Sequence, residues 1–145
     1  MLGLDTIILN ALQEDIHTGD LTTMAVVPEP RPATARLVAK EELKVAGIEV
    51  AARVFRLLDA SVRFEPCCSD GQAVEKGVVL ARLSGDAALL LQGERVALNL
   101  LQRMCGVATL TARYVAAVAG TKTRIVDTRK TTPGWRNLEK YAVAV

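Results

Sequence analysis

The sequence predicts an α+β fold in which amphipathic helices and short strands build one shared core. Apolar residues recur at helical spacing in three separate segments, and small or apolar residues alternate with polar ones in shorter segments between them. The chain has 145 residues, of which 50% are hydrophobic and only 3% are aromatic. This length is enough for one well-buried domain and the beginning of another.

The first element should be a helix from Leu4 to about Glu14. Its apolar residues fall on one helix face, and they are Leu4, Ile7, Ile8, Ala11 and Leu12. The helix should end near Gly19, within a loop from Glu14 to Thr23 that is rich in small polar side chains. The three carboxylates of this loop also suit a metal ion, but helix capping and turn formation are the favoured interpretation. His17 is interpreted as an ordinary loop histidine.

Extended chain and a second helix follow. A connector with three prolines, residues 28–32, leads into residues 33–40, which alternate like a half-buried strand. The residues of this strand that should face inward are Ala35, Leu37 and Ala39. Residues 47–58 carry apolar side chains at helical spacing, and residues 61–65 alternate again as a strand. The predicted helix face consists of Ile48, Ala52, Phe55 and Leu58.

The segment from Asp70 to Leu80 has the spacing of a compact strand-turn-strand unit, because two glycines at turns flank short apolar pairs. It resembles the biotinyl and lipoyl carrier domains. Those carriers take their cofactor on an exposed lysine at a hairpin tip, within a Met-Lys-Met or Asp-Lys-Ala sequence, and the segment has neither. The likeness therefore concerns architecture and not carrier function.

The longest apolar pattern runs from Asp86 to about Gly120 and predicts helix, with Gly106 as a break between two helices. Its apolar stripe consists of Leu90, Ala97, Leu101, Met104 and Ala108. Arg95 and Arg103 are spaced so that both side chains project from roughly the same side of one helix. From periodicity alone, we interpret them as surface arginines whose stems lie on apolar neighbours.

A short buried strand is expected from Arg124 to Thr128, and it leads directly into a basic segment. That segment reads Arg129-Lys130-Thr131-Thr132-Pro133-Gly134. In α/β folds, anions bind where strands end, and two adjacent cations beside several hydroxyls suit such a site. A solvated basic turn explains the same residues equally well, so the residues alone leave both interpretations open.

Charge and cysteine content exclude several classes of protein. The net charge is only +2 and the charged residues are dispersed, so nucleic acid is not an expected partner. No apolar stretch approaches the ~18 residues of a membrane helix, and the N-terminus lacks the pattern of a signal peptide, so we expect a cytoplasmic protein. Cys67, Cys68 and Cys105 have no metal-ligand spacing, so we expect reduced thiols that pack or lie at the surface.

Four blocks of the chain resemble one family, the quinolinate phosphoribosyltransferases, also called carboxylating nicotinate-nucleotide pyrophosphorylases. The blocks are Glu14–Thr23, Gly93–Arg103, Asp127–Arg136 and Glu139–Val143, and they follow the family's order with nearly its spacing. The molybdenum-transport protein ModD is a related branch, and a ModD-like protein is the alternative identification.

The resemblance implies an N-terminal open α/β sandwich with a linker helix, which we assign to residues 1–105, and the truncated start of an α/β barrel over residues 106–145. It also implies a glycosyltransferase of de novo NAD biosynthesis. Phosphoribose would pass from phosphoribosyl pyrophosphate to quinolinate with decarboxylation, giving nicotinate mononucleotide, pyrophosphate and CO2. Mg²⁺ would be required. Members are dimers in which the N-terminal domain of one subunit caps the barrel mouth of the other.

The resemblance also assigns substrate contacts. Arg129 and Lys130 would bind quinolinate, and Arg95 would enter the partner subunit's site across the dimer interface. This expectation replaces the surface interpretation of Arg95. Secondary contacts are expected from Thr128, Arg136 and Lys140. No residue is assigned to catalysis or to metal binding, since the metal ligands are expected in the part of the family pattern beyond Val145.

The chain departs from the family pattern at its end. Ala144 stands where the family has a basic residue, and the later Asn-His-Arg and Lys-Asp-Asn-His motifs are absent from the 145 residues. We therefore expect the isolated chain to be inactive, because a complete barrel takes at least ~200 residues. The competing function is a non-catalytic dimerisation or capping module that offers Arg95 to a longer partner.

Overall fold

A computed structural model of the chain describes residues 3–17 and 19–145. Met1, Leu2 and Thr18 lie outside the described residues, so the expectation for the loop from Glu14 to Thr23 is followed without Thr18. The elements in chain order are α1 (Leu4–Ile16), α2 (Leu21–Val26), β1 (Pro32–Val38), β2 (Leu43–Lys44), α3 (Ile48–Leu58), β3 (Arg63–Pro66), β4 (Ala73–Val74), β5 (Val79–Asp86), α4 (Ala87–Ala117) and α5 (Arg136–Ala144).

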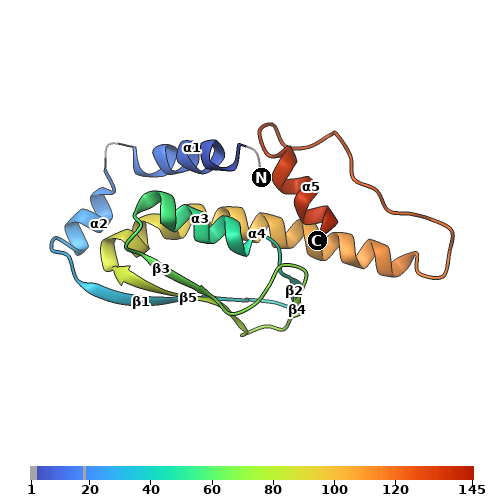
Figure 1. Ribbon diagram of the computed structural model, residues 1–145, viewed down its shortest axis with the longest axis horizontal. Coiled ribbons are helices and arrows are strands. Elements are labelled where there is room, and N and C mark those ends of the chain that lie inside the picture. Colours follow the sequence, from blue (N-terminus) through green and yellow to red (C-terminus); the bar gives the residue numbers. More distant parts are fainter. Residues whose placement is uncertain (1–2, 18) are drawn as a thin grey trace.

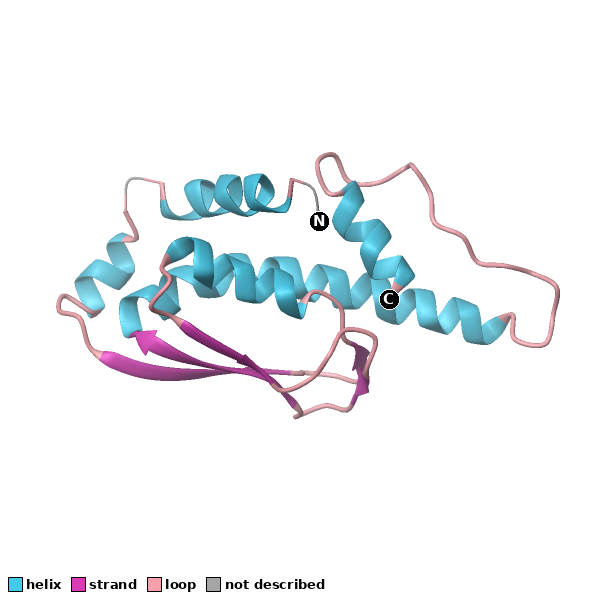
Figure 2. Ribbon diagram, in the orientation of Figure 1, coloured by secondary structure: helices cyan, strands magenta, loops and turns pink. Residues whose placement is uncertain are grey.

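The elements are stacked in layers (Figures 1 and 2). A three-stranded antiparallel sheet in the order β1-β5-β3 lies beneath α3 and α4, and α1 lies on the opposite side of these two helices. The pair β2 and β4 forms a second, two-stranded sheet beside α4. The prediction of a mixed helix-and-sheet fold is therefore confirmed.

The core is centred on α3 and α4, where one face of each helix meets the sheet. Side chains of α4 that are buried in this core include Leu90, Val96, Ala97, Leu100, Leu101, Met104 and Ala108. The two helices lie in close contact at Gly93, where a Cβ atom would lie 2.5 Å from the ring of Phe55. Gly47 is the N-cap of α3 and has a φ of +100°, a backbone conformation that glycine adopts without strain. It also lies against the Met104 side chain, which leaves no room for a Cβ atom. Glycine at both positions therefore sets how α4 and α3 pack.

The helix predictions are confirmed for α1 and α3 and wrong in two other places. The short helix α2 was not expected, although its cap was: Asp20 accepts a hydrogen bond from the Thr23 backbone N–H at 3.0 Å, so the capping interpretation is confirmed. Gly106 does not break the long helix, which runs unbroken from Ala87 to Ala117. Its neighbours Met104 and Cys105 are buried in the core, and this packing outweighs the ~1 kcal/mol that a helical glycine costs.

The strand predictions are confirmed for β1 and nearly so for β3, which begins two residues late at Arg63. Leu37 and Ala39 are buried as expected, but Ala35 is exposed because it borders an open groove beside α4. Residues 70–80 do form two strands joined by a turn, but β4 pairs with β2 whereas β5 pairs with β1 and β3. The unit is thus divided between two sheets and is not a hairpin.

The buried strand predicted from Arg124 to Thr128 is wrong for this structure. The segment is irregular and exposed, and Val126 has 77% of its surface accessible. A strand needs a neighbour to pair with its backbone N–H and C=O groups. Among residues 3–17 and 19–145, no strand lies alongside this segment.

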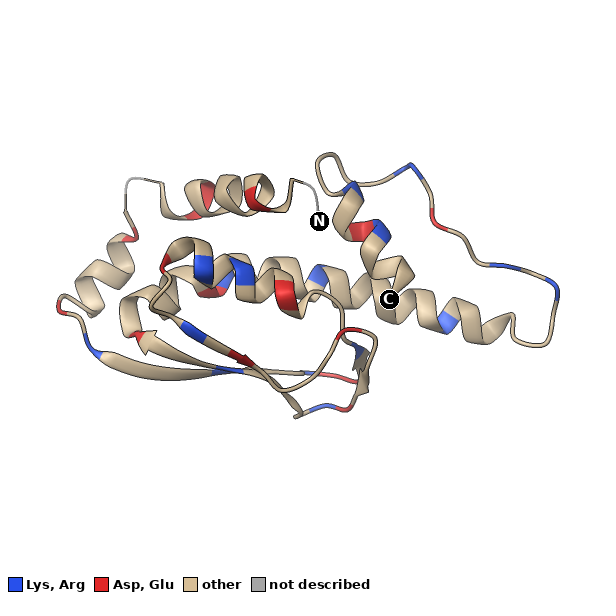
Figure 3. Cartoon of the chain, viewed as in Figure 1, with Lys and Arg blue, Asp and Glu red and all other residues tan. Residues whose placement is uncertain are grey.

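Charged and sulfur-containing side chains are distributed as the composition predicts. Lys and Arg are interspersed with Asp and Glu over the sheet and over α3, whereas α1 carries only acidic residues (Figure 3), and the net charge is +2. The three cysteines are free thiols, with Cys105 buried in the core and Cys67 exposed. None of the helices in the described part of the chain has the length and apolar character required to cross a membrane.

Two glycines of α4 should respond oppositely to alanine. Gly93→Ala should destabilise the fold by about 1–3 kcal/mol, because its methyl group has to displace the Phe55 ring. Gly106→Ala is the matched control, since an added Cβ meets nothing within 4 Å there, and it should stabilise the helix by about 0.5–1 kcal/mol. Urea unfolding of both variants measures the difference. Equal stability of the two would contradict the close approach of α4 and α3.

Candidate anion-binding site

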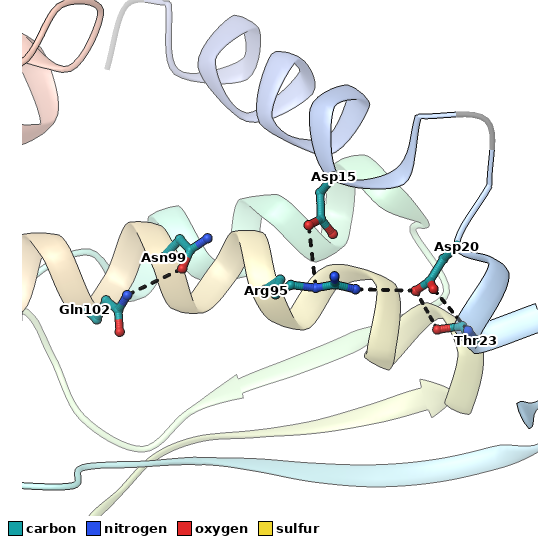
Figure 4. Close-up of polar contacts among 6 residues, drawn as sticks. All are labelled: Asp15, Asp20, Thr23, Arg95, Asn99 and Gln102. Atoms are coloured by element: carbon teal, nitrogen blue, oxygen red, sulfur yellow. Dashed lines mark hydrogen bonds and ion pairs between the residues drawn. The ribbon is translucent and has the colours of Figure 1, made fainter.

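Arg95 lies on the exposed stripe of α4, between the C-terminal end of α1 and the start of α2 (Figure 4). Its Nε lies 3.5 Å from Asp15 Oδ1, and its Nη2 lies 3.8 Å from Asp20 Oδ2. The Arg95 side chain is 61% exposed, so it remains accessible to a ligand while it contacts both carboxylates. Asn99 and Gln102 follow on the same helix, where the Gln102 amide nitrogen donates to the Asn99 side-chain oxygen at 3.4 Å.

Asp20, one of the two carboxylates beside Arg95, is held in place by hydrogen bonds from Thr23. Its Oδ2 accepts a hydrogen bond from the Thr23 hydroxyl at 2.5 Å, and its Oδ1 accepts one from the Thr23 backbone N–H. These bonds lower the pKa of Asp20 below the usual range, and the charge of Arg95 lowers it further. Asp20 is therefore ionised at neutral pH and joins the N-terminus of α2 to α4.

Arg103 projects from the same helix, but it pairs with a carboxylate of α5. Its Nη2 lies 3.0 Å from Glu139 Oε1 of α5, and Glu139 also accepts hydrogen bonds from the backbone N–H and the hydroxyl of Thr132. Burial alone would raise the pKa of Glu139, but the hydrogen bonds from Arg103 and Thr132 outweigh it and lower the pKa. Arg103 thus anchors α5 and the segment before it, and is a structural residue.

The basic segment before α5 is held in shape by its own backbone. The Lys130 N–H donates to the Thr128 hydroxyl at 3.1 Å, and Arg136 donates to the Thr131 hydroxyl at 3.2 Å and to the Arg129 carbonyl at 3.3 Å. Within the described chain, the side chains of Arg129 and Lys130 make neither a hydrogen bond nor an ion pair, and both residues are exposed. The segment therefore presents two unneutralised cations.

Lys140 of α5 contacts the same basic segment through Asp127. Its Nζ lies 2.9 Å from Asp127 Oδ2, so one carboxylate already balances its charge. The structure thus gathers five of the predicted substrate contacts around the start of α5: Thr128, Arg129, Lys130, Arg136 and Lys140. Arg95 does not belong to that group, because its ion-pair partners in the described chain are Asp15 of α1 and Asp20 at the start of α2.

The Asp70 carboxylate, which the sequence did not indicate as important, attaches α5 to the rest of the fold. Asp70 accepts hydrogen bonds from the backbone N–H groups of Gly47 at 2.9 Å and Ile48 at 3.0 Å, and from the Tyr141 hydroxyl at 2.7 Å. The carboxylate therefore caps α3 and holds α5 at the same time. Only the folded chain brings these residues together, since Asp70 precedes no helix in the sequence.

Two hollows lie beside α4. A largely apolar groove of about 730 Å³ opens between β1 and α4, with Leu37, Leu98 and Leu101 among its lining residues. A smaller cleft of about 340 Å³ lies between α1, α4 and Trp135. In the described part of the chain, no three His, Cys, Asp or Glu side chains gather in a way that would hold a metal ion. The exposed cations Arg95, Arg129 and Lys130 make this a candidate site for an anion.

Comparison with known proteins identifies relatives along the whole chain. The model of the quinolinate phosphoribosyl transferase N-terminal domain matches residues 20–105, and that of the C-terminal domain matches residues 107–145. A curated protein of Synechocystis sp., named probable nicotinate-nucleotide pyrophosphorylase (carboxylating), is 51% identical over 131 residues, which are 90% of this chain and 44% of that protein. A protein of the same name from Bacillus subtilis is 48% identical over 130 residues, or 90% of this chain and 45% of its own length.

A solved structure gives the same result for the fold. The crystal structure of NadC from Streptococcus pyogenes is similar with a TM-score of 0.93 and 41% sequence identity, over 97% of this chain and 50% of that one. A nicotinate-nucleotide pyrophosphorylase from Francisella tularensis is similar with a TM-score of 0.92 and 35% identity, again over 97% of this chain and 50% of its own. The chain therefore spans about half the length of the relatives it matches.

The contact between Tyr141 and Asp70 should be visible in alkaline titration. Hydrogen bonding to the Asp70 carboxylate raises the pKa of Tyr141 from 10.0 to about 12, because ionisation would bring two negative charges together. A raised pKa means that the contact contributes its stability below pH 10, and that this contribution is lost as the pH rises through about 12. Ultraviolet titration of the chain and of Tyr141→Phe measures it. The variant should lack the step near pH 12, and an unchanged titration would contradict the contact.

Proposed function

The chain belongs to the quinolinate phosphoribosyltransferase family, and we propose that it serves the family's reaction, in which phosphoribose passes from phosphoribosyl pyrophosphate to quinolinate with loss of CO2. The products are nicotinate mononucleotide and pyrophosphate. Because the chain spans about half of its relatives, this activity is proposed for the whole protein and not for these 145 residues alone.

The observation that carries the proposal is the pair of unneutralised cations Arg129 and Lys130. Quinolinate has two adjacent carboxylates, and binding such a dianion away from bulk water needs fixed positive donors. Arginine's planar fork matches a carboxylate in two hydrogen bonds, while lysine supplies a compact charge beside it. The hydrogen bonds of Thr128 and Arg136 to the same segment support its shape, so these two residues act as secondary contacts.

Phosphoribosyl transfer requires the protein to position the substrates and to neutralise charge, and it requires no covalent bond to the protein. Positive charge develops on the ribose carbon as pyrophosphate leaves, so the nucleophilic ring nitrogen must be held in line and the leaving group neutralised. Binding both carboxylates of quinolinate fixes the direction of its ring nitrogen. The later loss of the 2-carboxylate leaves electron density that the quaternary ring nitrogen of the substrate accepts.

Mg²⁺ remains part of the proposal through the family alone. The described residues do not form a group that fits the ion. Its ligands would come from the half of the relatives that this chain does not cover.

Lys140 is the remaining candidate for a substrate contact, and its ion pair with Asp127 leaves it half-exposed.

We propose that residues 1–105 form an open α/β sandwich domain and that residues 106–145 begin an α/β barrel. The two family models meet between residues 105 and 107, which supports this division. In a barrel, neighbouring strands would supply the pairing that residues 124–128 lack, and the predicted strand would form there. We place the protein in the cytoplasm, in de novo NAD biosynthesis.

We also propose a homodimer in which Arg95 of one subunit reaches the site of the other. Two observations support it: Arg95 is 61% exposed, and its described contacts are separate from the residues around α5. The exposed stripe of α4 that carries Arg95 also includes Leu91 and Leu98, which are apolar side chains that a second subunit would cover.

The full-length protein should form nicotinate mononucleotide from quinolinate and phosphoribosyl pyrophosphate. Arg129→Ala and Lys130→Ala should each cost about 2–5 kcal/mol in quinolinate recognition, the range for removing one partner of a buried charge pair. Lys122→Ala is the matched control, because Lys122 is an exposed cation of the same loop outside the proposed site. Calorimetric binding of quinolinate measures the loss. Unchanged quinolinate affinity in both variants would exclude the assignment.

Mixed dimers should show whether Arg95 crosses the interface. When Arg95→Ala subunits are mixed with Arg129→Ala subunits, a crossed site combines the intact Arg129 of one subunit with the intact Arg95 of the other. One of the two sites in each mixed dimer is then complete, so activity should return on mixing. If Arg95 instead serves its own subunit, each mixed dimer has one defect in each site and activity should stay absent.

A further inference from the structure

Two carboxylates flank Arg95, and the proposed function does not use them: Asp15 lies in the last turn of α1 and Asp20 is the N-cap of α2. Asp15 approaches Nε at 3.5 Å and Asp20 approaches Nη2 at 3.8 Å. The side chain of Asp15 is 22% exposed and that of Asp20 only 9%, whereas that of Arg95 is 61% exposed. The carboxylates are therefore largely buried while the Arg95 side chain, which lies between them (Figure 4), stays mostly exposed.

The contacts occupy one side of the guanidinium. Arginine has five N–H donors in a rigid fork. Asp15 and Asp20 make their closest approaches to Nε and Nη2, respectively. The end of the fork away from Nε is formed by Nη1 and the second hydrogen of Nη2. That end can bind a carboxylate in two parallel hydrogen bonds.

The two contacts of Arg95 are ion pairs and not hydrogen bonds, so the carboxylates attract the guanidinium without a hydrogen bond to it. Strong charged hydrogen bonds are about 2.7–2.9 Å long, and both contacts are longer. Asp20 cannot easily move closer, because two hydrogen bonds from Thr23 fix its carboxylate at the start of α2. An exposed arginine without partners would have to give up many rotamers on binding a ligand, which lowers affinity.

We propose that Asp15 and Asp20 are positioning residues that hold the Arg95 guanidinium by Nε and Nη2, so that its Nη1 end faces a carboxylate of the dicarboxylate substrate. The identity of that ligand rests on the proposed function, whereas the ion pairs themselves do not. The carboxylates also exert an opposing effect, since their negative charge repels a dianion. The sign of the change in KM on removing them decides which effect is larger.

Asp15→Asn and Asp20→Asn in the full-length protein test the proposal, because each removes a charge at nearly constant shape and Asn remains a good cap for α2. The KM for quinolinate should rise roughly 10- to 100-fold, by analogy with metal ligands that lose the partners orienting them. The KM for phosphoribosyl pyrophosphate and kcat should change little. Asp15→Glu should restore the KM. Glu14→Gln, which removes an exposed neighbouring charge, is the control and should leave all three constants unchanged.

The same changes in an Arg95→Ala background show whether the carboxylates act through Arg95. There they should have no further effect, because coupled residues are not additive. An equal rise in KM with and without Arg95 would overturn the proposal, and so would a fall in KM on removal of either carboxylate.

A measurement without substrate separates the positioning claim from the proposed function. Hydrogen exchange of the Arg95 Nε–H, followed by nitrogen-15 NMR, should be faster in Asp15→Asn than in the parent protein and unchanged in Glu14→Gln. Unchanged exchange in Asp15→Asn would overturn the positioning claim, even in a protein that turns over quinolinate. If exchange responds but Arg95→Ala leaves quinolinate KM intact, the positioning holds and the assigned ligand of Arg95 is wrong.

Discussion

The burial of one face of α4 is the constraint on which the rest of the structure depends. The helix runs unbroken from Ala87 to Ala117, and its buried side packs on α3 and on the sheet. Gly93 lets α3 approach as closely as the Phe55 ring allows, and Gly47 makes room for Met104. Because a helix is rigid, fixing its buried face also fixes where its exposed stripe points. This packing therefore determines the directions in which the side chains of Arg95 and Arg103 point.

Three carboxylates then attach the remaining segments to this frame. Asp20 caps α2 and faces Arg95, Asp70 caps α3 and accepts from Tyr141, and Glu139 joins Arg103 to Thr132. Each one connects chain segments that are distant in sequence. A carboxylate suits this task because it accepts several hydrogen bonds at once and is ionised at neutral pH. Arg129 and Lys130 take no part in these three attachments.

The sequence predicted the features that arise from local periodicity. The amphipathic spacing of α1 and α3 and the alternation of β1 indicated those elements, and the blocks around Arg95 and Arg129 indicated the family. Tertiary context decided the features that were missed. Packing carried α4 through Gly106, the groove left Ala35 exposed, and residues 124–128 had no strand to pair with. The contacts of Asp15, Asp20 and Asp70 join residues far apart in the chain, so no local pattern could reveal them.

The central claim is that three cations, Arg129, Lys130 and an Arg95 already oriented by two carboxylates, recognise one dicarboxylate. A crystal structure of the full-length protein with quinolinate tests it most directly. We predict that the carboxylates of quinolinate lie within hydrogen-bonding distance of Arg129, Lys130 and the Nη1 end of Arg95 from the partner subunit. Asp15 and Asp20 should still flank that guanidinium. Quinolinate bound away from these cations, or an Arg95 that has left both carboxylates, would contradict the account.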